Sequence, residues 1–164
     1  RWNEIDFELV NDKKLKVIGI HVPLPVKCKG NEDTRKREQY KRALDNITNE
    51  FPVVIIGDFN AATNDDRAIK KEDGNYSLKE NKRFLVRLNY KFNDAWREKN
   101  PLPSNEYTWF YNQNIKDGRR LDYAFLSENI KLELVEHNMD VNTTFHEDGL
   151  SDHSALIVEL KYEF

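Results

Sequence analysis

The sequence predicts an α/β domain built on a mixed sheet, and three observations lead to this prediction. An apolar run at 53–56 begins after a proline and ends at a glycine, which is typical of a strand buried on both faces. Segments of alternating apolar and polar residues lie before and after this run, and two segments with helical spacing separate them. We expect the 164 residues to form a single domain, 1–164, because a chain of this length usually buries a sufficient core without disulfides.

Composition limits the function classes. The single Cys28 excludes an intramolecular disulfide, and this leaves both a cytoplasmic and a secreted location open. Charged residues make up 34% of the chain and the formal net charge is -3, so there is no global basic field and any nucleic-acid binding must be local. No apolar run approaches the ~20 residues that span a bilayer, so we expect a soluble protein without a transmembrane segment.

The first part of the chain predicts a hairpin and a crossover helix. Alternating residues at 5–9 and an apolar stretch at 15–20 flank a polar turn at 11–14, which is a hairpin pattern. The segment 31–49 has helical spacing, with Asn31 as a candidate cap. This helix leads into the central strand, as a crossover connection does.

The second part predicts one more long helix and further strands. Ser77 and Glu80 form a capping-box signature, and apolar residues at 84–88 supply a buried stripe. The remaining elements are a short helical turn at 94–96, a hairpin of 107–111 with 119–126, and strands at 130–139 and 154–160.

Asp58 and Asn60 follow the central strand directly. They are two residues apart in near-extended chain, so their side chains leave on the same side and can converge on one ligand. The carboxyl end of a central strand is a common place for chemistry in α/β folds. A surface turn explains the same residues equally well, because Gly-Asp and Asn are ordinary turn residues.

Polar residues mark the ends of four predicted strands. Each has an ordinary structural explanation when taken alone, as a turn aspartate, a cap or a hydrogen-bonded histidine. Together they supply oxygen ligands for a hard cation and imidazoles for proton transfer or phosphate contact, and thiolate ligands for a structural zinc are missing. These residues are His21, Asp58 with Asn60, Asp122, and Asp152 with His153.

The order and the residues of several motifs resemble those of the endonuclease/exonuclease/phosphatase superfamily. This superfamily includes exonuclease III-like nucleases, pancreatic deoxyribonuclease, neutral sphingomyelinases and inositol polyphosphate 5-phosphatases. The motifs run in the family's order over nearly the whole chain. They are Gly19-Ile20-His21-Val22, Ile56-Gly57-Asp58-Phe59-Asn60, Tyr107-Thr108-Trp109, Gly118-Arg119-Arg120-Leu121-Asp122-Tyr123-Ala124-Phe125 and Leu150-Ser151-Asp152-His153-Ser154-Ala155-Leu156.

The resemblance implies a role for each matching residue. Asp58 and Asn60 would orient the attacking water, hold the phosphate and contribute to metal binding. Asp152 would help to bind the divalent cation, Mg²⁺ or Mn²⁺. His153 would contact the scissile phosphate or act as a base, polarised by Asp122. His21 matches the histidine of the deoxyribonuclease and sphingomyelinase branches.

The resemblance also implies that a large part of the family's domain is missing here. Family domains are about twice as long, and their first half supplies a glutamate that is a principal metal ligand. We therefore interpret the chain as the carboxy-terminal half of a four-layered α/β/β/α sandwich. This half should supply one sheet and its helices. The inner face of that sheet should lack a partner, which predicts either a missing amino-terminal half or self-association.

The leading hypothesis is a Mg²⁺-dependent hydrolase of phosphodiester or phosphomonoester bonds, nuclease-like, with DNA or RNA as a candidate substrate. A lipid or inositol phosphate phosphoesterase is an alternative. The aromatic residues at 107–111 could stack on bases or meet a lipid surface, although alternating strand aromatics are more often core. A second alternative is a partial, catalytically incompetent domain that serves as a binding module.

Overall fold

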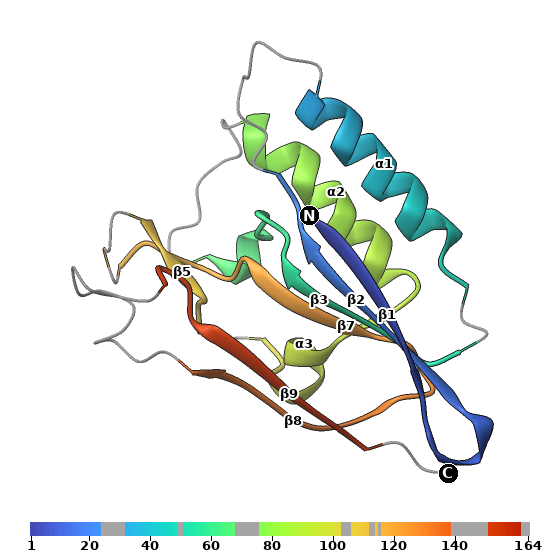
Figure 1. The fold of residues 1–164 in the computed structure, drawn as a ribbon. Coiled ribbons are helices and arrows are strands. Elements are labelled where there is room, and N and C mark those ends of the chain that lie inside the picture. Colours follow the sequence, from blue (N-terminus) through green and yellow to red (C-terminus); the bar gives the residue numbers. More distant parts are fainter. Residues whose placement is uncertain are drawn as a thin grey trace.

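A five-stranded mixed sheet forms the centre of the computed structural model (Figure 1). The structure describes residues 1–23, 32–48, 51–67, 76–102, 106–111, 114, 116–138 and 151–161. The strands, in spatial order, are β1 (Trp2–Glu8), β2 (Lys14–His21), β3 (Val53–Asp58), β7 (Asp122–Leu126) and β4 (Asn93–Asp94). β2 and β3 are parallel and the other neighbours are antiparallel, which confirms the prediction of an α/β fold with a mixed sheet.

The predicted hairpin and crossover are confirmed. β1 pairs with β2 in antiparallel register, and their connection contains a 3₁₀ turn at Val10–Asp12. Helix α1 (Glu32–Asn46) lies between β2 and β3 in the chain, and these two strands are parallel, as a crossover requires. The candidate cap Asn31 lies outside the described residues.

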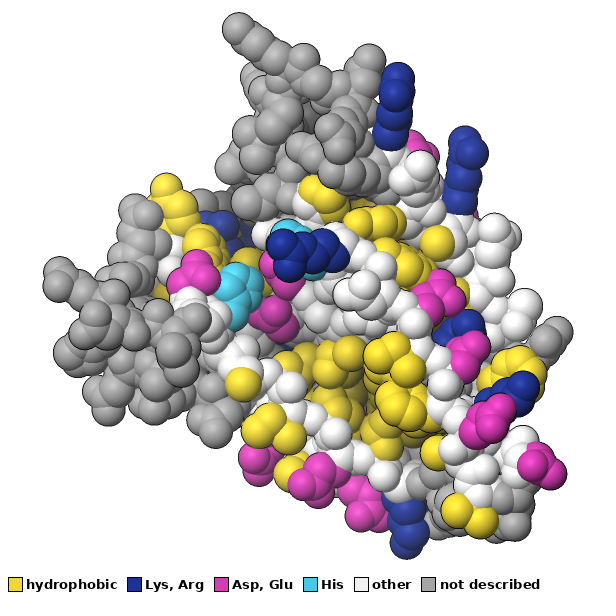
Figure 2. All heavy atoms as spheres, in the orientation of Figure 1, with side chains coloured by type: hydrophobic (Ala, Val, Ile, Leu, Met, Phe, Trp, Pro, Cys, Tyr) yellow, Lys and Arg dark blue, Asp and Glu magenta, His cyan; other side chains and the backbone are white. Residues whose placement is uncertain are grey.

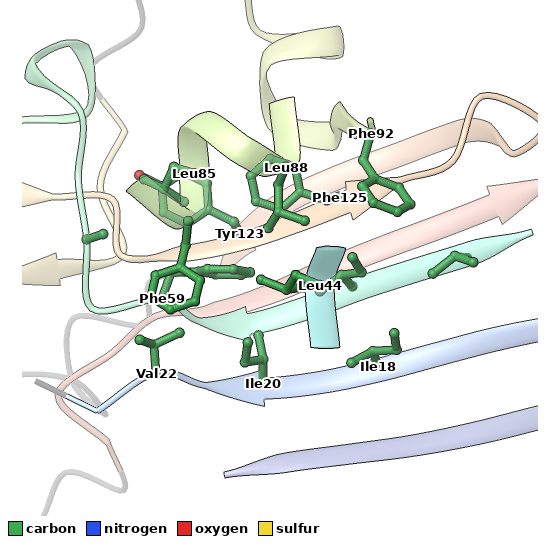
Figure 3. Packing of buried hydrophobic residues seen from close by; sticks show 14 residues of the cluster. Ile18, Ile20, Val22, Leu44, Phe59, Leu85, Leu88, Phe92, Tyr123 and Phe125 are labelled. Carbon is green, nitrogen blue, oxygen red and sulfur yellow. The ribbon is translucent and has the colours of Figure 1, made fainter. Parts of the chain in front are cut away.

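Helices α1 and α2 (Tyr76–Asn89) cover one face of the sheet (Figure 1). Helix α2 begins one residue before Ser77, so Ser77 lies in the first turn and does not precede the helix as a capping-box residue would. The buried stripe of the sequence prediction is present: Phe84, Leu85 and Leu88 pack against apolar residues of β2, β3 and β7 (Figure 3). No described helix is long and apolar enough to cross a membrane.

The opposite face of the sheet is covered in part. Helix α3 (Ala95–Lys99) and the antiparallel pair β8 (Lys131–Asn138) and β9 (Ala155–Lys161) lie on this side (Figure 1). Trp96 of α3 and Leu132 of β8 pack with Leu126 of β7 in a second core cluster. This layer is separate from the main sheet, so the described chain supplies more than the single sheet that we expected from a half-domain.

An apolar surface remains open over the outer strands of this same face. Ile5 and Phe7 of β1 are 53% and 45% exposed, and they pair in register with Val17 and Leu15 of β2, so all four side chains share one face. Figure 2 shows hydrophobic side chains gathered in a hollow between the sheet and the β8–β9 pair. We call Ile5, Phe7, Leu15, Val17 and Ile56 the open apolar face. Among the described residues, α3 and β8–β9 pack over β7 and reach Leu15 and Val17 of β2, whereas Ile5 and Phe7 of β1 stay exposed.

One predicted strand is divided in the structure. The segment 119–126 does not form a continuous strand, because Gly118–Arg119 is β6, paired with β5 (Trp109–Phe110), and β7 begins only at Asp122. At the break the backbone N–H of Arg120 donates to the Asp66 carbonyl at 2.9 Å, and the N–H of Leu121 donates to the Thr108 hydroxyl at 2.9 Å. These donors are therefore bound outside any strand ladder. The buried side chain of Arg120 binds the carboxylates of Asp66 and Asp94 at the same point.

Candidate active site

Strand register places three of the predicted site residues at one edge of the sheet. His21 is the pairing partner of Asp58 across β2 and β3, and Asp58 is the partner of Asp122 across β3 and β7. The His21 Nε2 atom lies 3.5 Å from Asp58 Oδ2. The site therefore begins as a row of side chains across three adjacent strands, and histidine and acidic side chains lie close together at this end of the molecule (Figure 2).

Gly57 permits this row to form. Its φ of 145° lies in a region that side-chain-bearing residues rarely adopt, and a Cβ at this position would stand 1.9 Å from the carbonyl oxygen of Ile20. Only glycine lets β3 approach β2 so closely immediately before the two strands present Asp58 and His21.

Asn60 fixes the carboxylate of Asp58. The backbone N–H of Asn60 donates to Asp58 Oδ1 at 2.7 Å, and its side-chain Nδ2 donates to Asp58 Oδ2 at 2.9 Å and to the Val22 carbonyl at 2.8 Å. Asn60 has a left-handed φ of 47°, which asparagine tolerates better than most residues. The structure thus brings Asp58 and Asn60 together, as their spacing predicts, with Asn60 holding Asp58 in place.

A residue absent from our sequence prediction holds the backbone around Asn60 in place. Asn81 of α2 is fully buried, and its Nδ2 donates to the carbonyls of Phe59, Asn60 and Pro23. The sequence did contain a signal, because Asn81 precedes Phe84, Leu85 and Leu88 by three, four and seven residues and is therefore a polar residue on the apolar stripe of α2. Such a residue needs polar partners in the core.

His153 is held by Asp122, as the resemblance implied. The His153 Nδ1 atom lies 2.8 Å from Asp122 Oδ2, and the histidine backbone forms a bridge with Trp109 of β5. Asp152 accepts a hydrogen bond of 3.0 Å from the indole Nε1 of Trp109. The segment before β9 is therefore tied to both β7 and β5, which orients its histidine and its carboxylate.

Thr108 connects these segments to one another. Its buried hydroxyl accepts hydrogen bonds from the backbone N–H groups of Leu121 and Asp122, at 2.9 and 3.2 Å. Its own N–H donates to the Arg119 carbonyl, and its carbonyl accepts from Ser154 N. Thr108 belongs to a motif that the sequence analysis singled out, but its positioning contacts follow only from the tertiary structure.

The side chains converge on a cavity of about 330 Å³. Asp122 lies behind His153 and does not itself line this space. The lining residues are His21, Asp58, Asn60, Trp109, Arg119, Leu121, Asp152 and His153. Trp109, Arg119 and Leu121 are walls of the cavity that our sequence prediction did not include among the site residues.

Burial and neighbouring charges shift the pKa values of three ionisable groups at the cavity. Burial raises the pKa of Asp58 to about 6, with the N–H of Asn60 opposing and the charge of Asp122 adding to the rise. Burial alone would lower the pKa of His153, but the hydrogen bond and charge of Asp122 raise it above the ordinary value. Burial, together with the positive charge at residue 1, lowers the pKa of His21.

The donor set fits part of a shell for a hard cation. Asp152 and Asp58 offer carboxylate oxygens, the ligand type that Mg²⁺ prefers. However, both Asp58 oxygens already accept hydrogen bonds from Asn60, and the described residues contain no cluster of three or more His, Cys, Asp or Glu side chains that could hold a metal ion. The described residues therefore fit Mg²⁺ in chemical type and fall short of a complete shell.

Comparisons with known proteins agree with this fold. The chain covers 54–65% of three similar solved structures, and no curated protein matches its sequence. The first is an AP endonuclease from Archaeoglobus fulgidus, with a TM-score of 0.72 and 18% identity; the match covers 95% of this chain and 64% of that chain. The second is the 3′ phosphatase NExo from Neisseria bound to a product DNA hairpin, with a TM-score of 0.69 and 21% identity, covering 97% of this chain and 65% of that chain. The third is the APE2 catalytic domain from Xenopus laevis, with a TM-score of 0.73 and 19% identity, covering 98% of this chain and 54% of that chain. A model of the Endonuclease/Exonuclease/phosphatase family matches residues 11–153, and the chain belongs to this family.

Proposed function

We propose that this chain carries the His–Asp part of a metal-dependent phosphoesterase site that hydrolyses phosphate ester bonds in nucleic acid. The observation that carries the proposal is that His153, held at 2.8 Å by Asp122, lines the same cavity as Asp58, which is fixed by Asn60. A partly buried carboxylate and a carboxylate-held imidazole in one cavity can supply a base and a phosphate contact for the hydrolysis of a phosphate ester.

Asp58 is the proposed base. Its carboxylate is ionised above its raised pKa of about 6, where it accepts a proton from water while the water oxygen forms a bond to phosphorus. Asn60 holds both carboxylate oxygens, so the proton acceptor keeps one orientation. As the new P–O bond forms, the bond to the leaving oxygen breaks, and that oxygen takes a proton from solvent or from an imidazole.

His153 is the proposed phosphate contact. Asp122 binds Nδ1, which leaves Nε2 to donate a hydrogen bond to a non-bridging oxygen, and the raised pKa keeps the imidazole cationic to a higher pH. His21 stands beside Asp58 on an exposed surface, where it can exchange protons with solvent. When bound, Mg²⁺ or Mn²⁺ would supply positive charge to the phosphate; Asp152, Asp58 and Asn60 are the described residues that would hold it.

The aromatic rim of the cavity suits a nucleic-acid substrate. Tyr111 is 47% exposed and lies beside Trp109, which lines the cavity, with ring centroids 6.0 Å apart. Exposed aromatic faces stack on bases without regard to sequence. One of the similar structures is a 3′ phosphatase bound to DNA, which supports the same substrate class.

The test is Asp58→Asn in the full natural polypeptide, because the chain spans only 54–65% of the similar structures. We expect hydrolysis of an oligonucleotide in Mg²⁺ to fall by about a hundredfold or more, because a positioned base contributes a barrier reduction of this size. Circular dichroism should show an unchanged fold. Asp45→Asn on α1 is a matched control, since Asp45 is an exposed carboxylate paired with Arg87.

Retained activity in the Asp58→Asn variant would remove Asp58 from the mechanism. If the unmodified polypeptide hydrolyses no phosphate ester in Mg²⁺ or Mn²⁺, the phosphoesterase proposal is wrong. Binding of an oligonucleotide without any cleavage would then identify the domain as a binding module.

A further inference from the structure

Arg119 brings a fixed positive charge to the wall of the cavity. It comes from β6, where it is the pairing partner of Trp109 in β5. Its guanidinium carbon lies 5.4 Å from the centre of the Trp109 ring and 5.3 Å from that of Tyr111. A cation–π contact involves the charge of the guanidinium and none of its N–H donors in a conventional hydrogen bond, so these donors can still bind an acceptor.

The neighbouring Arg120 shows how different an arginine with a structural role looks here. Arg120 is 1% exposed and makes hydrogen bonds of 2.9 Å to Asp66 and of 2.9 and 2.6 Å to Asp94. The guanidinium of Arg119, in contrast, has one hydrogen bond among the described residues, a long one of 3.5 Å to Asp117 Oδ1. Arg120 is therefore committed to the core, and most donors of Arg119 are not engaged by the described part of the chain.

The charges of the cavity explain why such a donor is needed. Asp58 and Asp152 line the cavity and repel an incoming phosphate, and Asp122 lies directly behind His153. Among the described lining residues, Arg119 is the one lysine or arginine. We propose that Arg119 binds an anionic oxygen of the substrate and so determines which phosphate esters the site accepts. This inference rests on the proposed function and extends it to substrate selection.

The anionic oxygen can belong to the reacting phosphate or to a phosphate next to it, and two pairs of substrates distinguish these two sources. The first pair is a phosphomonoester and a phosphodiester with the same leaving group, which differ in charge on the reacting phosphate. The second pair is a dinucleotide with and without a terminal phosphate, which differ in charge next to it. The variants are Arg119→Met, which keeps an apolar stem, and Arg119→Lys, which keeps the charge but not the planar fork.

Direct binding of inorganic phosphate separates this inference from the proposed function. Calorimetry on the full polypeptide should show about tenfold weaker phosphate binding in Arg119→Met, because a charge-assisted hydrogen bond is lost, and partial recovery in Arg119→Lys. In kinetics, KM should rise more than kcat, and the rise should be larger for the more highly charged member of one substrate pair. Arg87→Gln, which removes an exposed arginine of α2, is the control and should change neither quantity.

The outcomes are distinct. Weaker phosphate binding in Arg119→Met supports the inference even if no substrate is hydrolysed, in which case only the proposed function fails. Unchanged phosphate binding and unchanged KM in Arg119→Met would overturn the inference while leaving the phosphoesterase proposal in place. Failure of the unmodified polypeptide to bind phosphate would also overturn it.

Discussion

The imidazole of His153 is bonded through Nδ1 to Asp122 Oδ2 at 2.8 Å, although the two residues are 31 positions apart in the chain. Asp122 is the first residue of β7, and His153 lies shortly before β9. The bond therefore joins the main sheet to the second layer at the edge where the cavity lies. It also fixes which nitrogen of His153 is available to a substrate.

This bond predicts that Asp122 and His153 act as a unit. Asp122→Ala and His153→Ala should each lower kcat strongly, and the double variant should be little worse than the more damaging single one, because an imidazole without its carboxylate has already lost its orientation. The measurement is kcat for the four forms in the full polypeptide. Simple addition of the two penalties in ln kcat would contradict a shared role.

Thr108 should control both stability and activity. Thr108→Val keeps the shape but leaves the backbone N–H groups of Leu121 and Asp122 without their acceptor, which we expect to cost about 2–3 kcal/mol in free energy of unfolding. The value of kcat should also fall, because Asp122 orients His153. Thr108→Ser retains the hydroxyl and serves as the control. Equal urea unfolding curves for the two variants would show that the hydroxyl has no such role.

Asp58 predicts an unusual dependence of stability on pH. The pKa of Asp58 is raised in the folded state, from 3.8 to about 6, so the folded protein binds this proton more tightly than the unfolded chain. The resulting stabilisation is fully present below the unfolded pKa of 3.8 and is lost as the pH rises through about 6.

Asp58→Asn should therefore be more stable than the unmodified protein above about pH 6, by roughly 1–3 kcal/mol, after allowance for the bond lost to Asn60 Nδ2. The advantage should shrink as the pH falls from about 6 to about 4, as the aspartate becomes protonated. Chemical unfolding in the presence of a chelator measures both. If Asp58→Asn is less stable than the unmodified protein at every pH, the charged carboxylate of Asp58 does not destabilise the folded state.

The open apolar face predicts self-association of residues 1–164 when they are produced alone. Exposed apolar patches larger than a few hundred Å² are rare on monomers, and a second copy can cover such a face with the same face. Light scattering should give a mass above that of a monomer. Lysine substitutions at Ile5 and Phe7 should restore the monomer, whereas Val86→Lys, at a 46% exposed position on α2, should not.

The same isolated chain should hydrolyse a generic phosphodiester barely above background in Mg²⁺, because its described residues supply only part of a metal shell. A monomer with full Mg²⁺-dependent turnover would contradict the half-domain interpretation and would show that no further ligand is required.

The sequence by itself determined the elements and much of the topology. The apolar run at 53–56 is buried strand β3, the alternating residues before it form the β1–β2 hairpin, and the stripe of Phe84, Leu85 and Leu88 faces the core. These features depend on local periodicity, which a sequence displays directly. The ends of the predicted strands indicated His21, Asp58, Asn60, Asp152 and His153, and the motifs that resemble the family indicated the same residues together with Asp122.

Only the tertiary structure decided how these residues meet. The family resemblance implied that Asp122 polarises His153, but the 2.8 Å bond between them follows only from the structure. The three carbonyl contacts of Asn81 join positions far apart in the chain, and no local pattern encodes them. The same holds for the neighbouring arginines. Arg120 enters the core because Asp66 and Asp94 lie there to receive it, whereas Arg119 remains at the cavity because Trp109 and Tyr111 offer their ring faces. Side-chain partners across strands and layers are set by packing, and packing exists only once the chain has folded.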